Sequence, residues 1–193
     1  RQMCIRDRSG THLVENVIAV ISTGLAMGYT SEQISQTMGN MIFSDRIVRT
    51  DVPGGITILN DTYNSQPKSL EAALRVLDNS AGSRIALLGD MLELGSVSRA
   101  EHIAAGIHAA STVDHLVTIG YESRVLAQAA KEYGLTSVEM VNSNQEAIEA
   151  LLEIIDFGDT LLIKGSHSLR LDEVASALIS ELKSRSHEKD KTL

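Results

Sequence analysis

A single segment sets the fold, and it reads ITILNDTYNSQPKS from residue 56 to residue 69. Its first three residues are a β-branched run that predicts a strand, and residues 70–77 after it have helical periodicity. A polar turn therefore joins a strand to a helix, with Ser69 as the expected N-cap of that helix. A strand followed at once by a helix is the repeating unit of α/β proteins.

The turn itself carries a carboxylate, an aromatic hydroxyl and an amide, in Asp61, Tyr63 and Asn64. In open α/β sheets, ligands bind outside the carboxyl ends of the strands, where this turn is expected to lie. Such residues are also common in turns for conformational reasons alone. From the local pattern by itself, an ordinary turn is the favoured interpretation and a binding site is the alternative.

The alternation of strand and helix continues along the chain. Short apolar runs predict strands, and amphipathic runs after them predict helices. The expected strands are 56–59, 84–88, 116–119, 137–141 and 160–163, and the expected helices are 69–77, 99–110, 122–133, 145–154 and 171–182. Five such repeats predict a Rossmann-like, doubly wound α/β domain with a mostly parallel sheet. The charged residues 184–193 are expected to fray.

The residues before these repeats form a separate part. One helix is expected at 11–27, with Gly28 as its C′ residue, and a shorter one from about 30 to 39. Residues 42–55 lack clear periodicity, and we interpret them as a hinge followed by a turn at 53–55. The expected division is a start without a role at 1–9, one domain at 10–43, a second at 44–185 and a tail at 186–193. Because residues 1–9 match no pattern and do not begin with Met, we expect a truncated or artefactual start.

Composition narrows the classes of function. The 193 residues are 43% apolar but only 3% aromatic, so the core is expected to be aliphatic. A net charge of −8 argues against a nucleic-acid partner or an anionic membrane surface. Cys4 is the single cysteine, which is compatible with a reducing cytoplasm. No apolar run reaches the roughly 18 residues of a membrane span.

Several common catalytic motifs are missing from the sequence. It contains no Walker A loop, no G-x-G-x-x-G after a strand and no zinc-binding cluster of cysteine and histidine. No serine or cysteine nucleophile has a matching base, and we interpret His102 and His108 as helix residues that are simply exposed. The chain by itself therefore lacks complete machinery for phosphoryl or acyl transfer.

Two more turns follow predicted strands and carry polar groups. Lys164 and Ser166 offer an ammonium and a hydroxyl to an anionic group, or else they only cap a turn and a helix. Asp90 and Glu93 place two carboxylates after another strand, in the run DMLELG of residues 90–95. The apolar members of that run are expected to pack in the core.

Together the three turns resemble the Mur ligases, the ATP-dependent ligases of peptidoglycan synthesis. The residues that carry the resemblance are 60–69, 88–95 and 164–166, whose order and spacing match the C-terminal domain of that family. The second and third of these are similar to the branch that adds D-alanyl-D-alanine. The helix with Gly10, His12 and Asn16 is similar to the end of the family's central ATPase domain, and Arg46 to the arginine just past the hinge. The resemblance covers about residues 10–182.

The resemblance implies a reaction, its ligands and residue roles. ATP and Mg²⁺ activate the carboxylate of UDP-N-acetylmuramoyl-tripeptide as an acyl phosphate, which the amine of D-alanyl-D-alanine attacks. The resemblance implies that Asp61 binds the ATP ribose, that Arg46 binds the phosphates, and that His12 and Asn16 lie near the adenine. It implies that Tyr63 and Asn64 line the cleft. Substrate binding is implied for Lys164, Ser166, Asp90 and Glu93. Closure of the two domains is expected to exclude water. A monomer in the bacterial cytoplasm is the expected setting.

The sequence also departs from the family's pattern. Ser65 and Gln66 stand where the family usually has Ala and Asn. The P-loop, the magnesium ligands and the UDP-binding domain are expected upstream of Arg1, so we do not expect this chain alone to catalyse the reaction. Two alternatives stay open: another Mur-type ligase related to folylpolyglutamate or cyanophycin synthetases, or a non-catalytic nucleotide-binding or interaction module.

Overall fold

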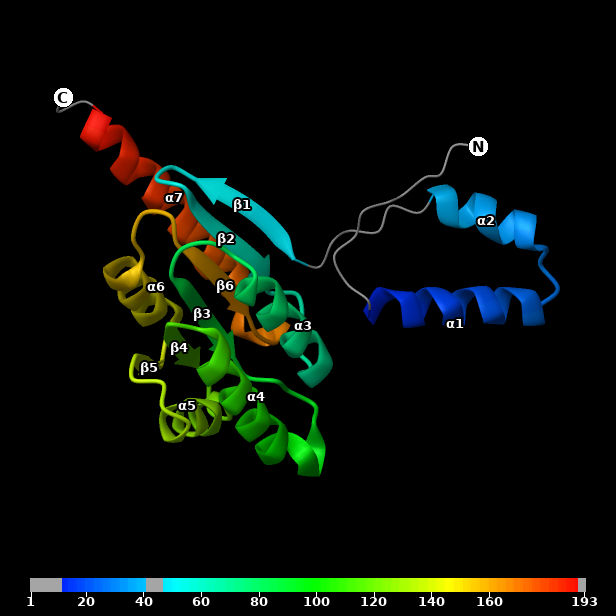
Figure 1. The fold of residues 1–193 in the computed structure, drawn as a ribbon, viewed down its shortest axis with the longest axis horizontal. Coiled ribbons are helices and arrows are strands. Elements are labelled where there is room, and N and C mark those ends of the chain that lie inside the picture. Colours follow the sequence, from blue (N-terminus) through cyan, green and yellow to red (C-terminus); the bar gives the residue numbers. More distant parts are fainter. Residues whose placement is uncertain (1–11, 41–46, 191–193) are drawn as a thin grey trace. The chain divides into compact units, whose positions relative to one another are not determined.

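The computed structural model describes residues 12–40 and 47–190, and their side chains for residues 17–38 and 47–185. The chain divides into two compact units, Arg1–Asp45 and Arg46–Leu193 (Figure 1). The first unit contains a pair of helices, and the second contains a sheet with helices around it.

The first unit has the two expected helices, α1 (His12–Ala26) and α2 (Ser31–Asn40). Gly28 follows α1 with a φ of +88°, the left-handed conformation that commonly ends a helix and that glycine adopts readily. At the start of α2, the Thr30 hydroxyl accepts the Gln33 backbone N–H, and the Gln33 side chain accepts the Thr30 backbone N–H. This reciprocal pair is a capping box and fixes where α2 begins.

The second unit is built on a six-stranded sheet with the order β1-β2-β6-β3-β4-β5. The strands are β1 (Val48–Val52), β2 (Ile56–Asp61), β3 (Arg84–Gly89), β4 (His115–Ile119), β5 (Val138–Val141) and β6 (Thr160–Lys164). Every neighbouring pair from β2 to β5 is parallel, and β1 is antiparallel to β2. The predicted mostly parallel, doubly wound α/β fold is therefore confirmed.

Strand β1 is the strand that the sequence interpretation missed. Its residues fall in the segment that we expected to be a hinge, whereas only the turn at 53–55 was predicted there. In the hairpin that β1 forms with β2, Val52 is buried, but Arg49 and Asp51 are exposed and pair with each other. An edge strand with one buried side chain lacks the apolar run of a central strand, and outward charges are usual at sheet edges.

Helices cover both faces of the sheet. They are α3 (Pro67–Asp78), α4 (Ser98–Thr112), α5 (Ser123–Glu132), α6 (Asn144–Ile154) and α7 (Leu171–Asp190), with short 3₁₀ turns at Gly95–Val97 and His167–Leu169. On β3, Ile85 and Leu87 pack into one cluster with α6 and α7, while Ala86 and Leu88 pack into another with α3, α4 and α5. This alternation places a mainly aliphatic core on each face, as the composition predicted. None of the helices in the described ranges is long and apolar enough to cross a membrane.

Two expected helix ends were wrong. Ser69 is not the N-cap of α3, because the helix begins at Pro67 and Gln66 is the N-cap. Proline suits the first helical position because its φ is preset and its missing N–H is not needed there. The last helix also extends beyond its expected end at residue 182, since α7 continues to Asp190. The expected fraying of residues 184–193 stays a prediction. Residues 171–190 contain no glycine or proline, and Arg185 pairs with Glu181 one turn earlier.

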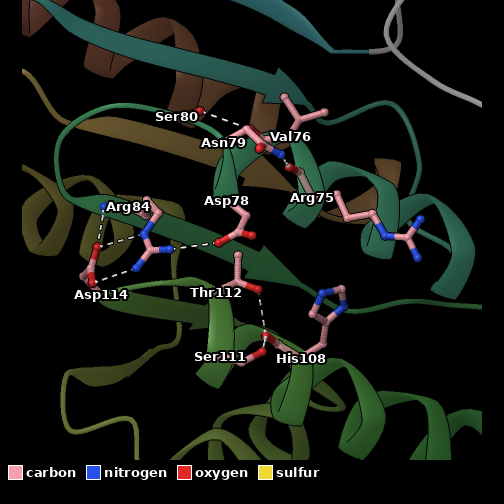
Figure 2. A network of polar contacts seen from close by, with 10 residues as sticks. All are labelled: Arg75, Val76, Asp78, Asn79, Ser80, Arg84, His108, Ser111, Thr112 and Asp114. Atoms are coloured by element: carbon pink, nitrogen blue, oxygen red, sulfur yellow. Dashed lines mark hydrogen bonds and ion pairs between the residues drawn. The ribbon is translucent and has the colours of Figure 1, made fainter.

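The amino edge of the sheet is held by a cluster of charges that contact water (Figure 2). The guanidinium of Arg84, at the start of β3, lies 2.9 Å from Asp78 at the end of α3 and 3.2 Å from Asp114 just before β4. The Arg84 backbone N–H also donates to the Asp114 carboxylate. These hydrogen bonds from Arg84 lower the pKa of Asp114, and the bond to Asp114 raises the pKa of Arg84.

Candidate functional site

A cavity of about 420 Å³ opens at the carboxyl edge of the sheet. It is lined by Tyr63 and Asn64 from the loop after β2, Leu92 and Glu93 from the loop after β3, and Ser166, His167 and Ser168 from the loop after β6. Strands β2, β6 and β3 are neighbours in the sheet. β6 leads to a helix on one face, while β2 and β3 lead to helices on the other, so their loops diverge. Such a switch in direction is where open α/β sheets bind ligands.

A buried ion pair lies behind the loop after β2, whose Asn64 lines the cavity. The Lys164 ammonium lies 2.7 Å from the Asp61 carboxylate, and their side chains are 1% and 5% exposed. The two residues face each other in the register of β6 and β2. The ammonium also donates to the backbone carbonyl of Asn64, at 2.7 Å. Lys164 therefore ties the loop after β2 to β6, and neither Lys164 nor Asp61 is among the residues that line the cavity.

Asp90 connects the loops after β3 and β4. Its carboxylate is buried and accepts hydrogen bonds from the backbone N–H groups of Tyr121, at 3.0 Å, and Ser123, at 2.7 Å. Ser123 is the first residue of α5, so an anion lies at the amino end of that helix, where it is favoured. Gly120 has a φ of +122°, and a Cβ there would overlap the Asp90 carboxylate. The position requires glycine on both grounds.

Ser166 connects the loops after β6 and β3. Its hydroxyl donates to the Asp90 backbone carbonyl at 2.7 Å and accepts the Leu92 backbone N–H at 3.0 Å. Its own backbone N–H donates to the same Asp90 carbonyl. The Gln66 side chain, from the loop after β2, holds the Leu92 carbonyl at 3.3 Å. These hydrogen bonds connect the cavity wall at Leu92 to the loops after β6 and β2.

Glu93 and Tyr63 are two of the exposed polar residues that line the cavity. Glu93 has a φ of +63°, a conformation that side-chain-bearing residues adopt rarely and that clusters at functional sites. Tyr63 is 74% exposed, and its ring centroid lies 6.2 Å from that of His167. A carboxylate beside two aromatic rings suits a ligand that has a positive or planar group.

The structure brings together most, but not all, of the residues that the sequence indicated. Tyr63, Asn64, Glu93 and Ser166 line the cavity, whereas Asp61, Lys164 and Asp90 support it from within. Arg46 lies outside the described residues. His12 and Asn16 lie in α1, in the other unit, and their side chains are not described. Their roles stay predictions.

His102 was interpreted wrongly. The sequence suggested an exposed helix residue, but His102 is completely buried in α4. Its Nε2 accepts the Met91 backbone N–H at 3.1 Å, so it contacts the loop after β3. The available signal was its spacing, because Ala105, Gly106 and Ala109 continue a stripe of small residues from His102 on one side of the helix, a pattern typical of close packing.

Metal binding finds no support in the part of the chain that is described. No group of three histidine, cysteine, aspartate or glutamate side chains there could hold a metal ion. The expected Mg²⁺ site remains a prediction for residues outside this set.

Comparison with known proteins decides the family. The model of the Mur ligase, glutamate ligase domain matches residues 45–167, which is more than half of the chain. The chain belongs to the Mur ligase family. This Mur ligase chain is 28% identical over 177 residues to UDP-N-acetylmuramoyl-tripeptide--D-alanyl-D-alanine ligase of Bacillus subtilis, covering 88% of the chain and 38% of that protein.

Two further relatives agree with this placement. The ligase of the same name from Haemophilus influenzae is 32% identical over 183 residues, with 90% of this chain and 38% of that protein covered. A crystal structure of MurF from Acinetobacter baumannii superposes with a TM-score of 0.70 at 28% identity, covering 89% of this chain and 38% of that one. The Mur ligase chain described here thus spans about 38% of the length of the relatives that it matches.

Proposed function

We propose that this chain is one part of an ATP-dependent ligase in the cytoplasm of a bacterium. The whole ligase joins D-alanyl-D-alanine to UDP-N-acetylmuramoyl-tripeptide. The observation that carries the proposal is the convergence of the three resembling turns on one cavity at the carboxyl edge of the sheet. Relatives that bear this activity in their names match the chain at 28% and 32% identity.

Within this proposal, the cavity-lining residues contact the ligands and the buried ones shape the cavity. Tyr63 and Asn64 are exposed at the cavity and suit a planar base or sugar. Glu93 suits the ammonium group of the dipeptide, since a carboxylate accepts charge-assisted hydrogen bonds. Asp61 and Lys164 neutralise each other below the surface, so they serve best to hold the loop after β2.

ATP, when bound, supplies the phosphoryl group that activates the carboxylate. Asn64 is exposed, so its amide side chain can contact a nucleotide. Lys164 holds the loop in place by donating to the Asn64 backbone carbonyl. The nucleotide roles of Arg46, His12 and Asn16 stay predictions, and residues outside the described set would hold Mg²⁺. The chain's own residues orient the reacting groups and, with closure of the domains, keep water away from them.

The proposal is tested in a ligation assay on the protein encoded by the natural reading frame that contains this sequence. The assay supplies ATP, UDP-N-acetylmuramoyl-tripeptide and D-alanyl-D-alanine, and it measures phosphate release that depends on the dipeptide. Tyr63→Ala is the informative variant, because Tyr63 is 74% exposed and its loss leaves the fold intact. We expect kcat/KM to fall about tenfold, equivalent to one lost stacking or cation–π contact of 1–2 kcal/mol.

Tyr133→Ala is the matched control, since Tyr133 is 64% exposed at the end of α5 and does not line the cavity. It should retain the parental rate. Activity with another amine, such as glutamate, would keep the ligase class and reject the D-alanyl-D-alanine branch. A folded protein that releases no phosphate with any amine would reject the enzyme altogether and favour a binding module.

A further inference from the structure

A histidine that does not line the cavity forms a hydrogen bond with the loop after β3. His102 is in the second turn of α4 and is completely buried. Its imidazole reaches back to Met91, whose side chain is also buried, at 1% exposure. The bond from the Met91 N–H to His102 Nε2, at 3.1 Å, is therefore shielded from water. A shielded hydrogen bond of this kind is costly to break, because the N–H is then left without a partner.

The contacts of the imidazole determine which ring nitrogen carries the proton. Nε2 meets a backbone N–H, which can only donate, so Nε2 must be unprotonated. Nδ1 lies 2.8 Å from the backbone carbonyl of Ser98, which can only accept, so Nδ1 must carry the proton. The Ser98 hydroxyl, 3.4 Å from Nδ1, donates to the Glu122 carboxylate and can therefore accept from Nδ1. The geometry thus requires a neutral ring with the proton on Nδ1. In this tautomer the ring links the first turn of α4 to the loop after β3.

This link joins the bonds that Ser166 makes to the same loop. His102 fixes the Met91 N–H, while Ser166 fixes the Asp90 carbonyl and the Leu92 N–H. Backbone groups of three consecutive residues are therefore held from two directions. Glu93 follows directly, with its φ of +63°. Because these hydrogen bonds restrain the three residues before Glu93, we expect them to hold the left-handed backbone at Glu93 in place.

We propose that His102 is a positioning residue that holds the loop after β3 so that Leu92 and Glu93 keep their place in the wall of the cavity. His102 does not line the cavity itself. The role of the cavity in ligation rests on the proposed function, but the hold of His102 on the loop does not.

The first test is spectroscopic and needs no activity. Long-range ¹H–¹⁵N spectra of the imidazole-labelled 193-residue chain at neutral pH report which ring nitrogen is protonated. We expect the Nδ1–H tautomer for His102. A ring protonated on Nε2, or on both nitrogens, would overturn the proposal because Nε2 could not then accept the Met91 N–H.

The second test uses two variants of His102. His102→Gln keeps an oxygen that can accept the Met91 N–H, whereas His102→Leu keeps volume but has no acceptor. Amide hydrogen exchange at Met91 and Leu92 should be at least about tenfold faster in the Leu variant and close to parental in the Gln variant. Unchanged protection of Met91 in the Leu variant would overturn the proposal. Should the Leu variant lose protection throughout β3 and α4, the Gln variant and the tautomer decide the question.

The third test connects the loop to the cavity in the ligase assay. His102→Leu should raise KM for D-alanyl-D-alanine about tenfold with a smaller change in kcat, and His102→Gln should restore most of it. His108→Leu is the matched control on the same helix, since His108 is among neither the contacts of this loop nor the residues of the cavity wall. Parental KM in His102→Leu would overturn the positioning role. A parent enzyme without ligase activity would reject the proposed function, while the two tests above would still decide the hold on the loop.

Discussion

At the carboxyl edge of the sheet, Lys164 and Asp61 form an ion pair whose side chains are 1% and 5% exposed. At the amino edge, Arg84 contacts Asp78 and Asp114 (Figure 2). The side chain of Arg84 is 29% exposed, and those of Asp78 and Asp114 are 55% and 44% exposed. Each edge thus joins neighbouring elements of the fold through charges. One edge does so in the interior and the other in contact with water.

The difference teaches where specificity and where tolerance are built into this domain. Charges removed from water are expensive to leave unpaired, so a buried network permits few substitutions and few alternative loop positions. Solvated charges are screened and can be replaced with little loss. We therefore expect the edge that forms the cavity to be the more rigid one, as the proposed ligand site would require.

The largest expected effect is the loss of one partner from the buried pair. Lys164→Met leaves the Asp61 carboxylate buried and unpaired, and it releases the Asn64 carbonyl. We expect the free energy of unfolding to fall by about 3–5 kcal/mol. Urea unfolding at pH 7, followed by circular dichroism, measures this change.

Arg84→Met is the matched variant at the amino edge. It removes a cation with two carboxylate partners, yet all three groups contact water. The expected loss is about 1 kcal/mol or less. Similar losses for Lys164→Met and Arg84→Met would show that burial does not separate the two edges as we argue.

A smaller effect of the opposite sign is expected at Ser65. Its hydroxyl is buried in the loop after β2 and has no hydrogen-bond partner in the described part of the chain. Ser65 stands where the resemblance to the family leads us to expect alanine. Ser65→Ala should raise the free energy of unfolding by about 1–2 kcal/mol, since an unsatisfied buried group is removed. Ser80→Ala is the control, because the Ser80 hydroxyl donates to the Val76 carbonyl. It should be neutral or slightly destabilising, and a destabilised Ser65→Ala would contradict the assignment.

The smallest effect concerns pH. Since the hydrogen bonds from Arg84 lower the pKa of folded Asp114, its stabilising contribution is present above the unfolded pKa of about 3.9. That contribution is lost as pH falls through the lower, folded pKa. Asp114→Asn should therefore be less stable than the parent by under about 1 kcal/mol at pH 6, and the two should converge near pH 2. Urea midpoints measured across this range check the sign; a gap that widens in acid would refute it.

The order of elements was predictable because each local signal agreed with the fold. Alternating strands and helices with apolar faces indicate a doubly wound sheet without knowledge of any contact. Strand β1 was missed because the signals for an edge strand are weak when only Val52 is buried. Ser69 was misplaced because a proline two residues earlier is itself a better start for the helix.

The three turns near residues 61, 90 and 164 could be recognised from the sequence, because polar residues after a strand are a local pattern. Which of their side chains face a ligand could not be read in the same way. Asp61 and Lys164 lie far apart in the chain, and only the parallel pairing of β2 and β6 brings them face to face and buries both. His102 reaches Met91 only because α4 packs under the loop. The residue types in each turn can be read from the sequence, because they are local. The burial of a side chain and the identity of its partners depend on contacts between distant segments, which only the tertiary structure decides.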